Sequence, residues 1–302
     1  MSTLRDWAEL LRVSALFTVP GDAVAGAVAA GMRPDGRTLR AIGCSLCLYE
    51  AGMVLNDWAD RDEDARERPH RPLPSGRIRP ATALGAAFGL TGAGVALAAS
   101  TGRPAALVSG ALAATVWAYD LWLKHTSAGP LAMGVARGLD VLLGATAAGG
   151  RISRRAVGAS SVLLAAHTLA VTHVARNETT GGSSRAPLAA LVTTCAIGTL
   201  VAMPVASRRA GASGCSGLVR PGCGNTVTAL AATYAAASSR PLLHASLNPS
   251  PPLTQRAVGG GIRALIPLQA ALVGRFGAPV LGAALMAGVP LARRVARKVS
   301  PT

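Results

Sequence analysis

Residues 39–64 read LRAIGCSLCLYEAGMVLNDWADRDED, so a mostly apolar run leads directly into a dense acidic motif. The apolar part, 39–56, is long enough for a helix to cross the hydrocarbon core of a membrane, which takes roughly 17–25 residues. The acidic part begins at Asn56 and places carboxylates at Asp57, Asp60 and Asp64. Together the two parts predict a transmembrane helix that carries a functional site where it leaves the membrane.

Apolar segments of similar length recur along the chain. The 302 residues are 50% hydrophobic and 15% charged, with a mean hydropathy of +0.39, whereas soluble domains carry about 25% charged residues. The composition therefore predicts an all-α, multi-pass transmembrane helical bundle that forms one domain over residues 1–302. The prolines within 246–255 predict a loop there. Further expected spans are 11–31, 80–100, 104–122, 130–150, 156–175 and 186–206, with weaker ones at 225–243, 257–274 and 276–292.

The net charge of +16 comes from basic residues in the short connections between apolar segments. In a soluble protein such a charge indicates nucleic acid. Here it fits loops that set membrane topology and meet anionic lipid head groups, so we expect no nucleic-acid partner. An even number of spans gathers most basic residues on the side of residues 57–79. We therefore expect an integral protein of the cell (plasma) membrane with its acidic motif facing the cytoplasm.

The spacing of the acidic motif places its carboxylates on one helical face. On a helix that continues from the apolar run, Asp57, Asp60 and Asp64 lie within about 60° of arc. Like charges so close repel one another unless cations lie among them. Oxygen ligands of this kind, with Asn56 beside them, suit Mg²⁺, which completes its octahedron with water and phosphate oxygens. The alternative is a solvated acidic loop, paired with Arg61, Arg66 and Arg68.

A basic loop stiffened by prolines follows the acidic face, and it reads RPHRPLPSGRI over residues 68–78. The planar guanidinium groups of Arg71 and Arg77 match phosphate oxygens and would reach a diphosphate held over the metal. The alternative is that these arginines only set topology.

The acidic motif and this loop together resemble the first aspartate-rich motif of the UbiA superfamily of intramembrane prenyltransferases. The segments Tyr119–Lys124 and Gly129–Gly138 resemble the same superfamily's next blocks, so the likeness covers about residues 10–180. The resemblance implies a bundle of about nine helical spans. It also implies a central cavity that opens sideways to lipid and binds an isoprenyl diphosphate through Mg²⁺.

The resemblance extends to single residues beyond the acidic motif. It implies that Lys124 contacts the diphosphate. The family spacing is Tyr-x-x-x-Lys, whereas Tyr119 here lies five positions before Lys124. The alternative for Lys124 is snorkelling to the membrane interface. Charges within a membrane span are functional candidates by default. Arg137 is therefore expected to bind diphosphate or line the cavity, with Asp140 as its ion-pair partner. Asp22, in the first expected span, is likewise a functional candidate.

The second half of the chain should carry a second aspartate-rich motif, but the matching place offers only Glu178, with Asn177 as a neutral oxygen ligand. This erosion resembles the divergent, EboC-like branch of the superfamily. Glu178 is the candidate for holding a second metal ion or for orienting the acceptor.

The resulting hypothesis is a Mg²⁺-dependent intramembrane prenyltransferase, a transferase of alkyl groups other than methyl. It would transfer an isoprenyl group from an isoprenyl diphosphate to a lipophilic acceptor. The alternative is a non-catalytic protein of the same fold that binds or transports a polyprenyl lipid. A CDP-alcohol phosphotransferase is disfavoured because the chain lacks that class's Asp-Gly-x-x-Ala-Arg run. The predicted metal ligands are Asn56, Asp57, Asp60, Asp64 and Glu178; the predicted catalytic residues are Asp57, Asp60, Asp64, Lys124 and Glu178; the predicted substrate-binding residues are Asn56, Arg71, Arg77, Tyr119, Arg137 and Asn177.

Overall fold

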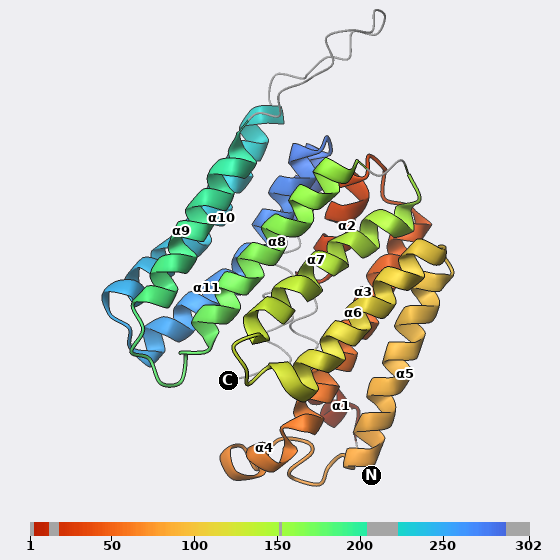
Figure 1. Ribbon diagram of the computed structural model, residues 1–302, viewed down its shortest axis with the longest axis vertical. Coiled ribbons are helices and arrows are strands. Elements are labelled where there is room, and N and C mark those ends of the chain that lie inside the picture. Colours follow the sequence, from red (N-terminus) through yellow and green to blue (C-terminus); the bar gives the residue numbers. More distant parts are fainter. Residues whose placement is uncertain (1–2, 12–17, 151–152, 204–222, 288–302) are drawn as a thin grey trace, which may run out of the picture. The chain divides into compact units, whose positions relative to one another are not determined.

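The computed structural model describes residues 3–11, 18–150, 153–203 and 223–287 (Figure 1). Within these residues the regular secondary structure is entirely helical, as the composition predicts. Seven helices are long and apolar enough to cross a membrane. They are α3 (Gly36–Ala59), α5 (Pro80–Ala99), α6 with its continuation (Arg103–Leu123), α7 (Gly129–Ala148), α8 (Arg154–Ala175), α9 (Arg185–Ala202) and α11 (Pro251–Arg275).

Six of these helices coincide with the expected spans from 39–56 to 186–206, and α11 with the weaker one at 257–274. The expected first span, 11–31, is represented by α2 (Pro20–Ala29), because residues 12–17 lie outside the described part. The remaining helices are α1 (Leu4–Leu10), α4 (Arg61–Glu67) and α10 (Cys223–Leu247), and residues 279–287 are also helical. A total of nine spans stays a prediction.

The expected loop at 246–255 is wrong in its extent. The helix α10 continues to Leu247, and α11 already begins at Pro251. Proline is well suited to the first turn of a helix, where its missing N–H has no partner to lose. Pro251 and Pro252 therefore start a helix, and only 248–250 connect the two.

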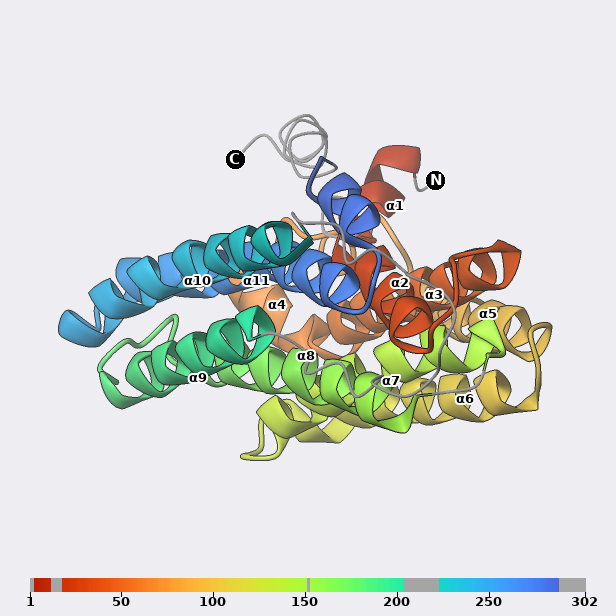
Figure 2. The ribbon, with the colours of Figure 1, turned by 90° about the horizontal axis from the view of Figure 1, so that it is seen from above.

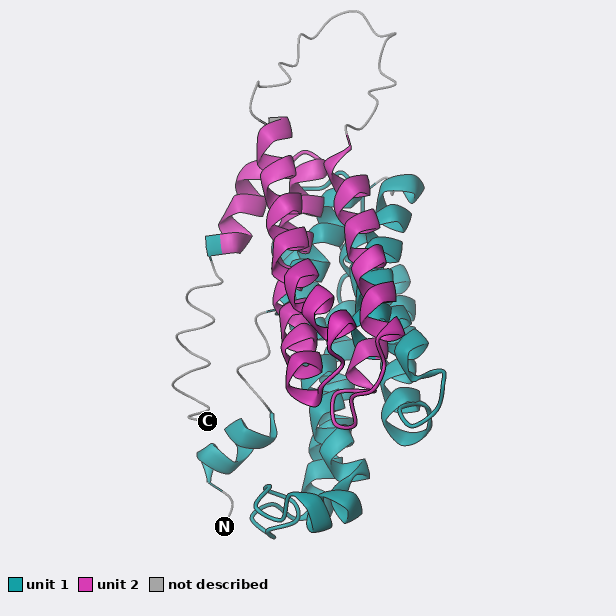
Figure 3. Ribbon diagram, turned by 90° about the vertical axis from the view of Figure 1, so that its left-hand side faces the viewer, with its two compact units in different colours: residues 1–172, 287–302 teal, residues 173–286 magenta. Residues whose placement is uncertain are grey.

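The helices form two compact units, residues 1–172 with 287–302 and residues 173–286 (Figure 3). In the first unit α3 packs on α5 and α6 packs on α7, so that long helices run side by side (Figures 1 and 2). In the second unit α9, α10 and α11 pack together. Whether the whole chain acts as the single domain expected from its sequence stays a prediction.

The helices α2 and α7 of the first unit approach each other closely at two glycines. A β-carbon on Gly26 would overlap the carbonyl oxygen of Val141, and one on Gly144 would overlap that of Ala23. Small residues at both crossing points let the two backbones touch, which is how helices associate where lipid removes the hydrophobic driving force. This contact fixes α2, and with it Asp22, against α7.

Filling this contact is expected to destabilise the protein. Gly144→Val should cost about 1–3 kcal/mol or more, because backbone rather than a flexible side chain must move. The measurement is the thermal unfolding midpoint in detergent. Gly89→Val is the matched control, since Gly89 in α5 has no atom within 4 Å of an added β-carbon. Equal midpoints for the two variants would contradict this account of the α2–α7 contact.

Candidate active site

The acidic motif lies where α3 ends and α4 begins. The helix is interrupted at Asp60, whose φ of −87° and ψ of 3° end α3. Hydrogen bonds from the Asp60 N–H to the Asn56 carbonyl and from the Asp64 N–H to the Asp60 carbonyl bridge the break. The interruption therefore keeps the motif's carboxylates on neighbouring turns, although α4 is a separate short helix (Figure 1).

Arg71 from the basic loop holds the outer two carboxylates together. Its Nη1 lies 2.7 Å from an Asp64 oxygen and 3.5 Å from an Asp57 oxygen. Both carboxylates are buried, with 5% and 3% of Asp57 and Asp64 exposed. Arg68 lies 3.6 Å from Asp64 as well. The repulsion expected among these acids is thus offset by arginines of the following loop.

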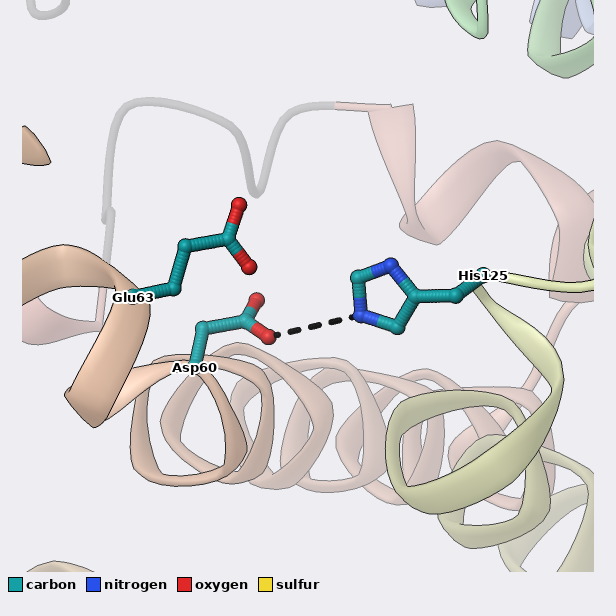
Figure 4. A group of neighbouring side chains, drawn as sticks. All are labelled: Asp60, Glu63 and His125. Carbon is teal, nitrogen blue, oxygen red and sulfur yellow. Dashed lines mark ion pairs between the residues drawn. The ribbon is translucent and has the colours of Figure 1, made fainter.

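Asp60 has a different partner, because Lys124 approaches it from the end of α6. The Lys124 Nζ lies 2.5 Å from an Asp60 oxygen, and the His125 Nε2 lies 3.8 Å from the same oxygen. Asp60, Glu63 and His125 form a group in which one possible metal-binding atom of each side chain lies within 4.8 Å of the others (Figure 4). The side chains of Glu63 and His125 point toward Asp60, so this group has the donor set of a metal site.

A π-helical turn, η2 (Tyr119–Leu123), places Lys124 there. The Lys124 N–H donates to the Tyr119 carbonyl at 2.9 Å, five residues back. Such single turns widen an α-helix by one residue and are frequent at functional sites. The wide spacing between Tyr119 and Lys124 is therefore absorbed by the backbone, and the two residues still follow each other along one helix face.

Arg77 contacts the N-terminal helix and not the acidic face. Its guanidinium lies 2.6 Å from Asp6 and 2.9 Å from Glu9 of α1, and it donates to the His70 carbonyl. Hydrogen bonds from Thr3, with those from Arg77, hold the pKa of Asp6 at about 2, so this pair stays charged at neutral pH. The loop itself is anchored by buried Leu73 and Ile78, which pack in a core cluster with residues of α1, α3 and α5.

A cavity of about 230 Å³ opens beside the motif, within the first unit. It is lined by one face of α3 from Ser45 to Asn56, by residues of α6 and η2 including Tyr119, and by Met133 to Asp140 of α7. Most of its lining is apolar. Asn56 and Tyr119, both predicted to bind substrate, thus line the end of the cavity next to the acidic motif.

Arg137 lines the same cavity and pairs with Asp22 of α2. Asp140 in turn accepts a hydrogen bond from the Ser45 hydroxyl. The expected ion pair between Arg137 and Asp140 is therefore wrong: the direct partner of Arg137 is Asp22, and Asp140 interacts with Arg137 only through longer-range electrostatics.

The eroded second motif lies in the second unit, just after α8. Asn177 donates from its side chain to the His173 carbonyl at 3.4 Å, and Gln255 donates to the Glu178 carbonyl at 3.4 Å. Gly181 and Gly182 follow with φ of 65° and 84°, and the Gly182 N–H bonds the Pro249 carbonyl. The turn is thus tied to the α10–α11 connection, and the metal-binding role of Glu178 stays a prediction.

Sequence reasoning missed Glu63, His125, Ser45 and Tyr49. Two signals were available: Glu63 lies one turn after Asp60, and His125 follows Lys124 directly. For Ser45 and Tyr49 the only signal was their place on the α3 face that also carries Asn56.

The model of the UbiA prenyltransferase family matches residues 16–206, which include the acidic motif, the basic loop and α7. The chain belongs to the UbiA prenyltransferase family. With its seven apolar helices it is an integral membrane protein. The narrower likeness to the EboC-like branch stays a prediction.

Two curated relatives of this UbiA family member carry different names. One is the digeranylgeranylglyceryl phosphate synthase of Korarchaeum cryptofilum, 35% identical over 118 residues, which are 38% of this chain and 41% of the relative. The other is the protoheme IX farnesyltransferase of Acidiphilium cryptum, 34% identical over 159 residues, half of each chain. The chain thus spans about half the length of the curated relatives that it matches.

Solved structures share the fold of this UbiA family member. A UbiA homolog from Archaeoglobus fulgidus, bound to GPP and Mg²⁺, has a TM-score of 0.62 at 14% identity and covers 89% of this chain and 99% of its own. An apo UbiA homolog from Aeropyrum pernix K1 has a TM-score of 0.58 at 18% identity and covers 90% of this chain and 96% of its own. At these identities the likeness establishes the fold.

Proposed function

We propose that this protein is a Mg²⁺-dependent intramembrane prenyltransferase that transfers an isoprenyl group from an isoprenyl diphosphate to a lipophilic acceptor. The observation that carries the proposal is the arrangement of Asp57, Asp60 and Asp64 around Arg71 and Lys124 at the mouth of an apolar cavity. Support comes from the family match and from the A. fulgidus homolog, which was solved with GPP and Mg²⁺.

The donor set fits Mg²⁺. Asn56, Asp57, Asp60 and Asp64 offer the oxygen ligands that this ion prefers, and Glu63 adds another carboxylate beside Asp60. Cations already lie against these carboxylates, since Lys124 and Arg71 are within ion-pair distance. Bound there, Mg²⁺ would supply Lewis-acid stabilisation of the departing diphosphate. Glu178 is proposed as the residue for a second metal ion or for the acceptor.

The chain's own residues would act mainly by electrostatics. Lys124 and Arg71 would each exchange a carboxylate partner for a diphosphate oxygen. They would then stabilise the diphosphate as the C1–O bond breaks and it leaves with the bonding electrons. The acceptor nucleophile then bonds to C1, and its proton passes to the released diphosphate. The apolar cavity keeps water from the allylic cation that develops. We leave Arg77 out of the diphosphate set, because Asp6 and Glu9 hold it.

We further propose that the acidic motif faces the cytoplasm of a plasma membrane. The basic loop of residues 68–79 lies beside it, and the positive-inside rule favours the cytoplasmic side for such loops. The membrane lipid would supply the hydrophobic acceptor through the sideways opening that the family resemblance implies.

Turnover should depend on Asp60 and not on its neighbour Asp62. Purified protein is incubated with labelled isoprenyl diphosphates, Mg²⁺ and a membrane extract, and lipid products are separated. Asp60→Asn should lower product formation about 100-fold or more, the usual cost of losing one transition-state electrostatic contact. Asp62→Asn is the matched control, since the Asp62 side chain is 85% exposed and, among the described residues, pairs with Arg61 alone; it should stay within about threefold of wild type.

The proposal fails if wild type and Asp60→Asn give the same products, or if neither gives any. Diphosphate binding without any product would favour the non-catalytic alternative, a protein of this fold that binds or transports a polyprenyl lipid.

Lys124 should oppose the binding of Mg²⁺ alone while favouring the binding of diphosphate. The Lys124 ammonium pairs with the Asp60 carboxylate and so competes with Mg²⁺ for it. Lys124→Met should therefore tighten the binding of Mg²⁺ in the absence of diphosphate by about tenfold, or ~1.4 kcal/mol. The same substitution should weaken the binding of diphosphate by a similar factor. Titration calorimetry measures both. Arg66→Met is the matched control: it removes an equal charge nearby, on an arginine whose guanidinium donates a hydrogen bond to the Asp62 carbonyl and, in the part of the chain that the structure describes, forms no ion pair. Unchanged or weaker Mg²⁺ binding by Lys124→Met would refute the idea that Lys124 exchanges the Asp60 carboxylate for a diphosphate oxygen.

A further inference from the structure

A chain of direct contacts links Arg71, which holds the acidic motif, to the N-terminal helix α1. The Ser75 hydroxyl donates to the Arg71 carbonyl at 2.6 Å, and the Ser75 N–H donates to the same oxygen at 3.0 Å. The Nε of Arg77 in turn donates to the Ser75 Oγ at 3.0 Å. The Nη1 of Arg77 lies 2.6 Å from Asp6 and 2.9 Å from Glu9, and its Nη2 lies 3.2 Å from the other Glu9 oxygen. The carboxylates of α1 are thus connected to the backbone of Arg71.

Arg77 holds the backbone of Arg71 from both sides. On one side its Nη2 donates at 2.7 Å to the carbonyl of His70, which belongs to the peptide group that leads into Arg71. On the other side it holds Ser75, which bonds the Arg71 carbonyl. Arg77 makes five hydrogen bonds in all, as many as a guanidinium group has donors. Its planar fork is therefore fully used in tying the loop to α1.

The helix α1 is itself fixed against the end of α3. Leu10 of α1 is fully buried, and it packs in one core cluster with Leu73 and Ile78 of the basic loop. The same cluster includes Val54 and Leu55 of α3, which directly precede the acidic motif. Apolar packing and ion pairs together therefore hold α1 against both the loop and the helix that carries the motif.

A fixed backbone matters for Arg71 because its side chain is long. The Nη1 of Arg71 lies 2.7 Å from Asp64 and 3.5 Å from Asp57. Groups that bind a ligand must be held within about 0.5 Å of the productive geometry. A guanidinium group that is already in place also loses less conformational freedom when it binds an anion. The contacts from α1 therefore prepare Arg71 to bind phosphate oxygens.

We propose that the carboxylates of α1, acting through Arg77, are positioning residues for Arg71, so that α1 sets how tightly the site binds a diphosphate. The word diphosphate rests on the proposed function; the placement of Arg71 by α1 does not. If α1 only held the fold together, the cost of losing its carboxylates would be the same with or without the Arg71 guanidinium. Positioning requires that this cost disappear when the guanidinium is removed.

A double-mutant cycle measures this difference. The purified full chain is titrated with an unreactive thiolo analogue of geranyl diphosphate in the presence of Mg²⁺. Asp6→Asn combined with Glu9→Gln should weaken binding about tenfold, or ~1.4 kcal/mol. In a chain that already carries Arg71→Gln, the same two substitutions should change the affinity by less than about twofold, because no guanidinium is left to position.

A matched pair of arginine variants supplies the control. Arg77→Gln should weaken binding about tenfold, as the α1 variant does. Arg79→Gln removes an equal charge two residues further on and should stay within about twofold of wild type. Arg79 is exposed, and its side chain makes no ion pair or hydrogen bond within the described ranges. If a charge variant does not fold, Ser75→Ala carries the cycle, with an expected loss of about threefold for one exposed hydrogen bond.

Hydrogen exchange of the loop tests the placement without any ligand. In lipid nanodiscs, the amides of residues 68–78 should exchange at least about fivefold faster in the α1 variant than in wild type, since their local opening becomes easier. The amides of α5, which follows the loop, should exchange at the same rate in both and serve as the internal reference.

Equal affinity of wild type and the α1 variant would overturn the inference. A loss of the same size in the Arg71→Gln background would also overturn it, as would unchanged exchange of the loop. Wild type that binds no diphosphate analogue, together with faster loop exchange in the α1 variant, would sink the proposed function and leave the placement of the Arg71 loop by α1 standing.

Discussion

The pairing of three motif carboxylates with two cations from distant parts of the chain is the interaction on which the site depends. Asp57 and Asp64 share Arg71, and Asp60 pairs with Lys124. Without such partners, neighbouring carboxylates at the end of one helix would repel one another. The same two cations are suited to a diphosphate, so the contacts that hold the motif together also prepare it to exchange one anion for another.

The architecture around this site follows from close helix contacts that bring charges together inside the membrane. The glycines of α2 and α7 let the two backbones touch, and this contact carries Asp22 to Arg137. The π turn η2 shifts the end of α6 so that Lys124 reaches Asp60. The α2–α7 crossing thus positions the charged residues at the inner end of the cavity, and the π turn η2 positions Lys124 at its mouth.

Local sequence was sufficient to predict the seven long apolar helices and the place of the acidic motif at a helix end, but not the extent of the 246–255 connection or the interruption at Asp60. Apolar length predicts the spans, and a spacing of three and seven residues places three carboxylates on neighbouring turns. The partners of those carboxylates were harder to predict, because they depend on tertiary packing. Asp22 and Arg137 are 115 residues apart, and Arg77 meets Asp6 across 71 residues. Nothing in a single sequence specifies such pairs before the glycine contact and the loop anchors are known.

The most direct measurement of the central claim is the binding of an unreactive thiolo analogue of geranyl diphosphate to the purified protein, titrated with and without Mg²⁺. We expect Mg²⁺ to tighten binding at least about tenfold, or ~1.4 kcal/mol, and this dependence to vanish in Asp60→Asn. Equal affinity of the wild-type protein with and without Mg²⁺ would contradict the assignment of the acidic motif as a metal–diphosphate site.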